Sequence, residues 1–177
     1  GLRPVKVLKY EIPKNTGVRV DCPPACLKKL KNPSIPLYIT EGQKKADSLA
    51  TAGACAIDLL GVWNFKGRNE FGATTILADF DFVAWENRSV RIVFDSDVMY
   101  KPSVRQAMER LTEILQRKGA TVSAIYMPNH PSGAKWGVDD WLASGHDLKD
   151  LEALAELPRP IPQAALPTIE LLDEPSP

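Results

Sequence analysis

The stretch VRIVFDSD at residues 90–97 decides the fold, because its apolar, β-branched run stops abruptly at two acidic residues. The same pattern occurs earlier, where IPLYIT at residues 35–40 leads into Glu41 and a glycine. A short apolar run that ends in an acid and a turn signal predicts a buried parallel strand with a carboxylate at its carboxyl end. Open α/β sheets place their ligands at that edge. We therefore expect Glu41, Asp95 and Asp97 to meet there, as oxygen ligands for a divalent cation such as Mg²⁺ or Mn²⁺.

Strand and helix patterns alternate on both sides of this stretch. The clearest helix is expected at residues 102–118, where apolar residues recur at helical spacing between Pro102 and Gly119. The segment 75–85 is expected to be helical, although its Asp-Phe-Asp-Phe alternation also suits a strand. The other expected strands are 35–40, 54–60 and 121–126, and the other expected helical segments are 43–52, a turn starting at residue 139, and 148–157. This alternation predicts an α/β fold with a mainly parallel four-stranded sheet, right-handed crossovers and helices on both faces.

The chain divides into three parts by composition. Residues 1–34 are interrupted by prolines and are expected to form an irregular N-terminal lead-in that packs on the core. Residues 35–157 carry the α/β pattern. Residues 158–177 are rich in proline and lack periodicity, which predicts a linker or tail, so that the native protein continues into another domain.

Charge and cysteine content limit the function classes. The 177 residues contain 22 Lys+Arg and 22 Asp+Glu, so nucleic-acid binding would depend on a local basic patch. No apolar run is long enough to span a bilayer and no signal peptide opens the chain, so we expect a cytoplasmic protein without a membrane partner. Three sparse cysteines fit a reducing compartment. Cys22 and Cys26 could begin a zinc site, but no second close ligand pair follows, so buried thiols are the better interpretation.

Each acidic motif also has an ordinary structural explanation. Asp and Ser are favoured in turns that follow strands, so residues 95–97 could simply form a capped turn. Glu41 could be a first-turn acid that interacts with a helix dipole. A third acidic pair, Asp139 and Asp140, follows the strand at 121–126 and could begin a helix as an N-cap. Three acidic clusters that each follow a strand of one sheet nevertheless favour a shared site.

Basic residues accompany these acids. Lys44 and Lys45 follow Glu41 by about one helical turn, near a helix N-terminus that attracts phosphate. Lys66, Arg68 and Lys135 are on loops expected at the same edge and would extend a phosphate-binding or nucleic-acid-binding track. A solvated helix face is the alternative for the lysine pair. The aromatic residues near Lys66 could stack on a base, or they could fill the core.

The combined motifs resemble a known family. The order Thr40–Gly42, Phe94–Asp97 and Gly137–Asp140 is similar to the Toprim domain of primases, topoisomerases and related nucleases. The motifs TEGQKKAD at residues 40–47 and GVW at residues 61–63 are more similar still to a Toprim-like family of unknown function. That family is found in phage, plasmid and integrative-element primase-like replication proteins. The resemblance covers roughly residues 5–155, and its motifs are specific as a set.

The resemblance implies a role for each acid. Glu41 would act as general acid/base or as a metal ligand, Asp95 and Asp97 would bind Mg²⁺ and take part in catalysis, and Asp139 or Asp140 would supply a further ligand. It implies a primase-like nucleotidyltransferase that acts on nucleotides and single-stranded DNA in the replication of a mobile element. A helicase, either C-terminal to this segment or in trans, is the partner it implies.

Three alternative functions remain open at this point. A Toprim-type nuclease would use the same ions to cleave rather than extend a strand. A non-catalytic module would bind metal, DNA or a replication partner without turnover. A phosphatase of the haloacid-dehalogenase type also uses an Asp-x-Asp strand end, with Lys135 and the Asp139/Asp140 pair as helpers. That family, however, places Thr or Val where this chain has Met99, and its first Asp opens the fold.

Overall fold

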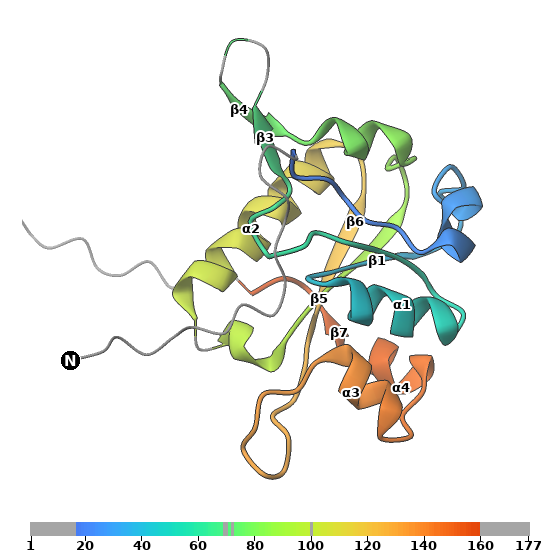
Figure 1. Ribbon diagram of the computed structural model, residues 1–177, viewed down its shortest axis with the longest axis vertical. Helices are drawn as coiled ribbons and strands as arrows, with labels where there is room; N and C mark the ends of the chain where they lie inside the picture. The colour runs from blue at the N-terminus through green and yellow to red at the C-terminus, as the bar shows by residue number, and fades with distance from the viewer. Residues whose placement is uncertain (1–16, 69–70, 72, 100, 160–177) are drawn as a thin grey trace, which may run out of the picture.

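The computed structural model describes residues 17–68, 71, 73–99 and 101–159, and shows a five-stranded sheet in the order β2-β1-β5-β6-β7 (Figure 1). The four strands β1, β2, β5 and β6 are parallel, and β7 pairs antiparallel with β6 at one edge. The strands are β1 (Leu37–Thr40), β2 (Cys55–Asp58), β5 (Ser89–Phe94), β6 (Thr121–Tyr126) and β7 (Ala155–Glu156). The α/β class and the mainly parallel sheet are therefore confirmed.

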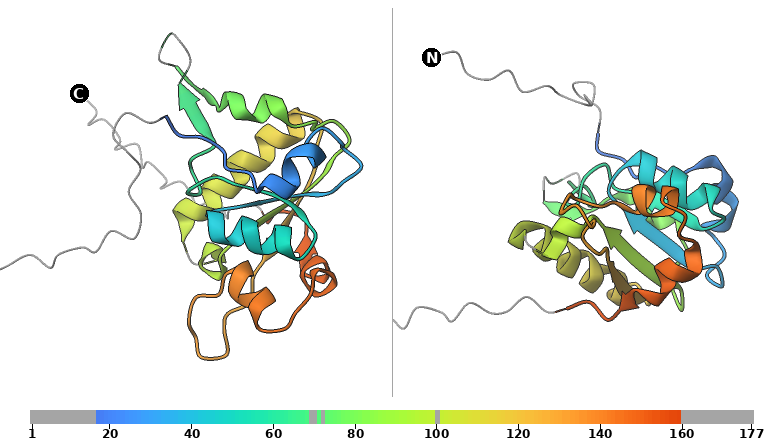
Figure 2. Two further views of the ribbon diagram at one scale, coloured as in Figure 1. Left: turned by 45° about the vertical axis from the view of Figure 1, so that its right-hand side comes forward. Right: turned by 90° about the horizontal axis from the view of Figure 1, so that it is seen from below.

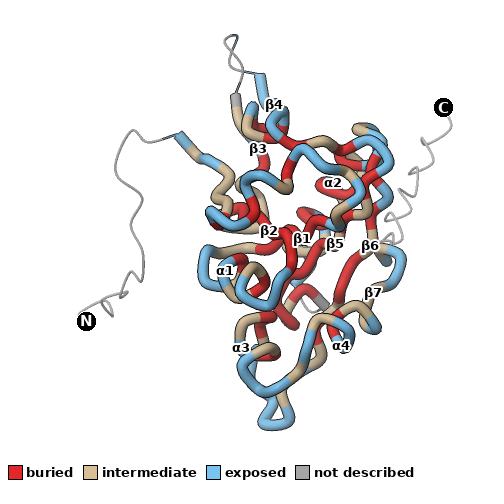
Figure 3. The backbone as a smooth tube through the Cα atoms, turned by 90° about the vertical axis from the view of Figure 1, so that its right-hand side faces the viewer, coloured by how far each residue is buried: buried red, intermediate tan, exposed pale blue. Residues whose placement is uncertain are grey.

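The strands form where the apolar runs predicted them, because helices cover the sheet on both faces. All four residues of β1 and of β2 are buried, which is the pattern of a parallel sheet with no solvated face. Figure 3 shows the strands as the most deeply buried part of the molecule, surrounded by exposed helix surfaces and turns. The strand at 90–94 begins one residue earlier than predicted, and the strand at 121–126 has the predicted bounds.

Two groups of helices cover the two faces (Figure 2). One face packs against α1 (Gln43–Thr51), α3 (Val138–Ala143) and α4 (Leu148–Ala153), through residues such as Leu49, Trp141 and Leu151. The other face packs against α2 (Pro102–Arg117) and two 3₁₀ helices, η1 (Pro24–Lys29) and η2 (Ala78–Phe82). A third 3₁₀ helix, η3 (Ser96–Met99), links β5 to α2. Helices on both faces are thus confirmed.

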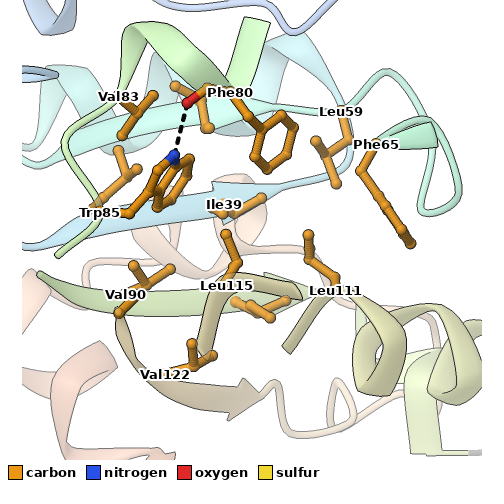
Figure 4. Packing of buried hydrophobic residues seen from close by; sticks show 14 of the residues in the cluster. Ile39, Leu59, Phe65, Phe80, Val83, Trp85, Val90, Leu111, Leu115 and Val122 are labelled. Carbon is orange, nitrogen blue, oxygen red and sulfur yellow. Dashed lines mark hydrogen bonds between the residues drawn. The ribbon is translucent and has the colours of Figure 1, made fainter. Parts of the chain in front are cut away.

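The larger core lies under α2 and η2 (Figure 4). Leu111 and Leu115 from α2 and Phe80 from η2 are at most 1% exposed. Trp85 is also buried, and its indole Nε1 donates to the Phe80 carbonyl over 2.7 Å, so this large side chain leaves no unpaired donor in the core. This packed layer covers one face of the central strands, whose carboxyl ends carry the acidic residues.

Three predictions about the sheet and its surroundings need correction. The sheet has a fifth strand, β7, where residues 148–157 were expected to be helical throughout. The segment 75–85 is not one helix: it begins in β4 (Thr74–Ile76) and continues in η2. Strand β4 pairs antiparallel with β3 (Lys66–Arg68), which was expected to be loop, and this hairpin projects from the end of the molecule opposite the 128–137 loop (Figure 1).

The lead-in is described from residue 17 and does pack on the core. Asp21 pairs with Asp58 at the end of β2 through two backbone hydrogen bonds of 2.9 and 3.0 Å, and Cys26 in η1 is fully buried. The segments 1–16 and 160–177, which include the predicted tail, lie outside the described residues. In the described part of the chain no helix combines the length and apolarity needed to cross a membrane.

Candidate functional site

Glu41 and Asp95 meet at the carboxyl edge of the sheet because they follow neighbouring parallel strands. Strand β1 ends at Thr40 and β5 ends at Phe94, and the register pairs Ile39 with Ile92. Glu41 Oε1 accepts a hydrogen bond of 3.0 Å from the backbone N–H of Asp95. The glutamate of one strand end is therefore fixed to the backbone of the next.

Lys45 connects these two carboxylates. It lies one turn into α1, and its Nζ is 2.8 Å from Asp95 Oδ1 and 3.3 Å from Glu41 Oε1. The side chains are well shielded, since Lys45 is 17%, Glu41 13% and Asp95 5% exposed. An ion pair with so little solvent contact is weakly screened, so Lys45 is a structural member of the cluster rather than part of a solvated helix face.

Lys135 approaches the same cluster from the 128–137 loop. Its Nζ lies 2.5 Å from Asp95 Oδ2 and 3.2 Å from Asp97 Oδ2. Asp97 also pairs with Lys101, one turn further along the chain, at 2.5 Å. The two acids of the DSD motif therefore share one ammonium group, and each also has a second lysine partner.

Asp139 joins the cluster through Gly137. A Cβ built on Gly137 would lie 2.6 Å from Asp139 Oδ1, 2.9 Å from Asp95 Oδ1 and 2.9 Å from Lys45 Cε. The two carboxylate oxygens and the Lys45 carbon thus pack against Gly137 where a side chain would otherwise stand. Asp139 is paired with Lys44 at 2.9 Å, whereas Asp140 is 59% exposed and 3.9 Å from the same ammonium group. Asp140 is the outermost of the predicted metal ligands.

Ser96 holds the 128–137 loop against the site. Its Oγ accepts from the Trp136 backbone N–H at 3.0 Å, and its own N–H donates to the Trp136 carbonyl at 3.1 Å. Ser96 is 2% exposed and stands between Asp95 and Asp97. This reciprocal pair sets the position of Lys135, the residue immediately before Trp136.

The electrostatics of the cluster follow from burial and lysine pairing. Burial, with Asp95 as the nearby charge, raises the pKa of Glu41 to about 7 despite Lys45. For Asp97, burial acts in the same upward direction, but hydrogen bonds from Lys101 and Lys135 hold its pKa below the ordinary value. Burial likewise opposes the shift at Asp139, where Lys44 holds the pKa low. Glu41 is the member of this set whose proton is exchangeable near neutrality.

The donor chemistry of the cluster suits a hard divalent cation, but ammonium groups now stand between the carboxylates. Asp95 Oδ1 is buried and, despite the nearby Lys45 ammonium, accepts no hydrogen bond of acceptable angle. This oxygen, Asp139 Oδ1 and the Lys45 Cε atom crowd against Gly137, which has no side chain to hold them apart. Across residues 17–68, 71, 73–99 and 101–159, however, no three His, Cys, Asp or Glu side chains are grouped closely enough to hold an ion as they stand. A cation would have to displace a lysine.

Other predicted contacts lie elsewhere. Lys66 is in the β3–β4 hairpin, with its Nζ 3.8 Å from the Trp63 ring centre, and its surroundings are aromatic rather than acidic. The side chain of Arg68 lies outside the described residues. Phe65 is fully buried, as expected for an aromatic residue that fills the core. The cysteines are free thiols, with Cys26 buried and Cys22 half-buried.

Sequence reasoning missed three contributors to the site. Ser96 and Gly137 carry no charge, and their importance depends on contacts between segments some 40 residues apart. Lys101 had a weak signal, its i,i+4 spacing from Asp97. The pairing of Lys45 with Asp95 was also unpredictable, because it requires the register of β1 against β5.

Two comparisons with known proteins add to this geometry. A family model described as "Domain of unknown function (DUF3854)" matches residues 28–147. An uncharacterized protein from Picosynechococcus sp. is 34% identical over 131 residues, which cover 69% of this chain and 13% of that protein. The chain therefore spans about one eighth of the length of this relative, and neither description states an activity.

Proposed function

The chain belongs to the DUF3854 family, and we propose that it is a Toprim-like, Mg²⁺-dependent nucleotidyl-transfer domain of a larger DNA replication protein. Primer synthesis is the proposed reaction, with nucleotides and single-stranded DNA as substrates. A relative of which this chain covers only 13% supports its placement as one domain among several, where a helicase would act beside it.

The meeting of Asp95 Oδ1 and Asp139 Oδ1 against Gly137 is the observation that carries this proposal. These oxygens come from segments more than 40 residues apart, and Glu41 joins them through the Asp95 backbone. The motif order that resembles Toprim supports the same interpretation.

The chain's own residues suggest how the reaction is divided among them. Asp95 and Asp139, with Asp97 beside them, would hold the ion, which would stabilise charge on a phosphoryl group and orient the reacting oxygen. Glu41, with a pKa raised to about 7 by burial, is suited to accept and return a proton near neutral pH. Lys135 and Lys44 are 53% and 76% exposed and would turn from the carboxylates to phosphate oxygens.

A non-catalytic module is the second candidate, and the lysine pairing favours it. Lys45 and Lys135 neutralise Asp95 from both sides, so the cluster is stable without an ion. Such a domain would bind DNA or a replication partner without turnover. A nuclease would use the same proposed residues to cleave a nucleic-acid strand rather than to extend it. A haloacid-dehalogenase-type phosphatase is disfavoured, because β1 and β2 precede the strand that carries Asp95.

Nucleotide incorporation on a primed or unprimed single strand tests the proposal. Wild type, Asp95→Asn and Glu41→Gln would be compared in Mg²⁺ and in Mn²⁺, with template integrity followed in the same samples. We expect metal-dependent extension by wild type, and a loss of about 100-fold or more in both variants, as found when groups that stabilise transition-state charge are removed.

The matched control is Glu113→Gln, which removes an exposed carboxylate that is paired with Arg110 at 2.7 Å on α2. Its activity should equal that of wild type. Template cleavage that depends on Asp95 would indicate the nuclease. DNA binding without turnover, unchanged by Asp95→Asn, would indicate the non-catalytic module.

A further inference from the structure

A pocket lies between α1 and the α3–α4 corner, on the side of α1 that faces Asp139. On α1, residues 44, 48 and 51 follow one another on one face, and residues 139, 142 and 143 do so on α3. The Lys44–Asp139 ion pair of 2.9 Å joins the two stripes at the end next to the cluster. Lys44 therefore lies one helical turn from Ser48, between this region and the carboxylate cluster.

The pocket is shallow and open, with a volume of about 600 Å³. This volume falls in the range of small-molecule sites. Its lining combines hydroxyl groups, aliphatic carbons, an imidazole and an ammonium group, contributed mainly by Ser48, Thr51, Leu142, Ala143, His146 and Lys149. Such a wall offers an apolar surface for a flat ring, with donors and acceptors around it.

His146 is the flat group of this pocket, and its orientation is fixed. One face of its ring stacks on Trp141 with centroids 3.6 Å apart and an angle of 20° between the planes. Its Nδ1 is 2.9 Å from Ser144 Oγ. Because Trp141 covers one face, the ring presents its other face or its edge to the pocket. A supported aromatic ring of this kind is a suitable stacking surface for a nucleobase.

We propose that this pocket binds the base and sugar of a nucleotide whose phosphates extend along Lys44 to the carboxylate cluster. The proposal rests on the proposed function, since it names the subsite that would hold the substrate's nucleoside part. Thr51 lies seven positions after Lys44 on α1, which is about 10 Å at 1.5 Å per residue. A single nucleoside triphosphate is long enough to cover that distance.

The acidic residue of the pocket does not oppose this assignment. Asp147 lines the wall, but its Oδ1 accepts from the backbone N–H groups of Lys149 and Asp150 at 2.8 and 3.0 Å. The negative charge of Asp147 is thereby stabilised by the backbone N–H groups at the start of α4. The phosphate end of the ligand would lie outside the pocket, beside Lys44.

Calorimetric titration with deoxyadenosine triphosphate in EDTA tests the pocket without any metal, and inorganic tripolyphosphate is the second probe. His146→Ala removes the stacking ring, and Ala143→Phe fills the pocket from an exposed position on α3. We expect each variant to bind the nucleotide about tenfold more weakly, the loss of roughly one stacking interaction. Tripolyphosphate binding should be unchanged. Ala25→Phe, at an exposed position in η1, is the size-matched control.

Equal affinity of the two probes for wild type would overturn the assignment, because the base and sugar would then contribute nothing. Equal weakening of both probes in the variants would also overturn it. The result is independent of catalysis: nucleotide binding that is sensitive to His146, in a protein that fails the incorporation assay, would refute the proposed function and leave the pocket intact.

Discussion

Strand β5 carries a buried charge at each end, and the two are stabilised in different ways. At its amino end, Arg88 is fully buried and donates to the carbonyl of Leu30 at 2.6 Å and that of Lys29 at 3.2 Å. At its carboxyl end, Asp95 is held between two lysine side chains. Backbone carbonyls cannot leave, whereas an exposed lysine can rotate into solvent. The hydrogen bonds of Arg88 at the amino end are therefore structural. At the carboxyl end, a metal ion could replace a lysine beside Asp95.

The largest effect is expected at the structural end. Arg88→Met should lower the free energy of unfolding by about 3 kcal/mol, because it removes two buried hydrogen bonds from a charged donor to carbonyls of the lead-in. Urea denaturation followed by circular dichroism would measure it. Unchanged or increased stability would show that the desolvation penalty of the Arg88 guanidinium equals or exceeds the stabilisation from its hydrogen bonds. The two ends of β5 would then not differ in the way described.

Asp58 is a third buried ionisable group. It ends β2 at the carboxyl edge of the sheet and has no lysine partner among the ion pairs of the described residues, so its pKa shows the effect of burial. It is fully buried, and burial raises its pKa to about 6, against the hydrogen bond from Leu60 N–H; Asp21 adds to the rise. Because the folded pKa exceeds the unfolded one, the folded state retains a proton that the unfolded state has released. The stability contributed by this proton is present below about pH 4 and is lost as pH rises to about 6.

Asp58→Asn should therefore flatten the dependence of stability on pH between about 4 and 6, by an amount on the order of 1–3 kcal/mol. Urea midpoints of wild type and variant at several pH values across that window measure the difference. The exposed Asp81→Asn is the matched control and should preserve the wild-type slope. A slope that is the same in Asp58→Asn would mean that Asp58 is ionised in the folded protein.

Gly137→Ala addresses the carboxyl end by steric means. The added methyl group would overlap Asp139 Oδ1 and Asp95 Oδ1, so these side chains must move apart. We expect a stability loss of about 1 kcal/mol, together with weaker Mn²⁺ binding, measured by paramagnetic resonance. Gly17→Ala, where nothing lies within 4 Å of the new Cβ, is the control. Unchanged Mn²⁺ affinity in Gly137→Ala would place the ion elsewhere.

The smallest effect is expected at the loop contact. Ser96→Ala removes the hydroxyl that accepts from Trp136 N–H and should cost about 1 kcal/mol. Because Lys135 would then be held less firmly on Asp95 and Asp97, its acetylation measured by mass spectrometry should become faster. The exposed Ser34→Ala should change neither quantity. If Lys135 reacts at the wild-type rate in Ser96→Ala, the serine does not position it.

The sequence predicted what depends on local pattern. The apolar run ending at Asp95, the helix between Pro102 and Gly119, and the parallel alternation were all recoverable, because burial imposes a period on each element. The β3–β4 hairpin was not, since its strands are three residues long and residues 74–76 are largely exposed. The edge strand β7 has only two residues and forms through pairing with β6.

The sequence predicted that the acidic residues gather at one edge of the sheet. It did not predict which lysines pair with them. Glu41, Asp95 and Asp139 could be placed at one edge because each follows a parallel strand. Which lysine neutralises which acid depends on loop geometry, since Lys135 reaches Asp95 from a loop whose next residue, Trp136, is held by Ser96. The role of Arg88 was invisible as well, since its partners are backbone carbonyls.

Anomalous diffraction from crystals soaked in Mn²⁺ would decide whether the carboxyl end of β5 exchanges lysine for a metal ion. We predict an anomalous peak bonded to Asp95 and Asp139, with Lys135 turned away from Asp95, and no such peak in Asp95→Asn. Lys45 and Lys135 still in contact with Asp95, with no manganese at this edge, would contradict the proposal and leave the cluster as a structural salt-bridge network.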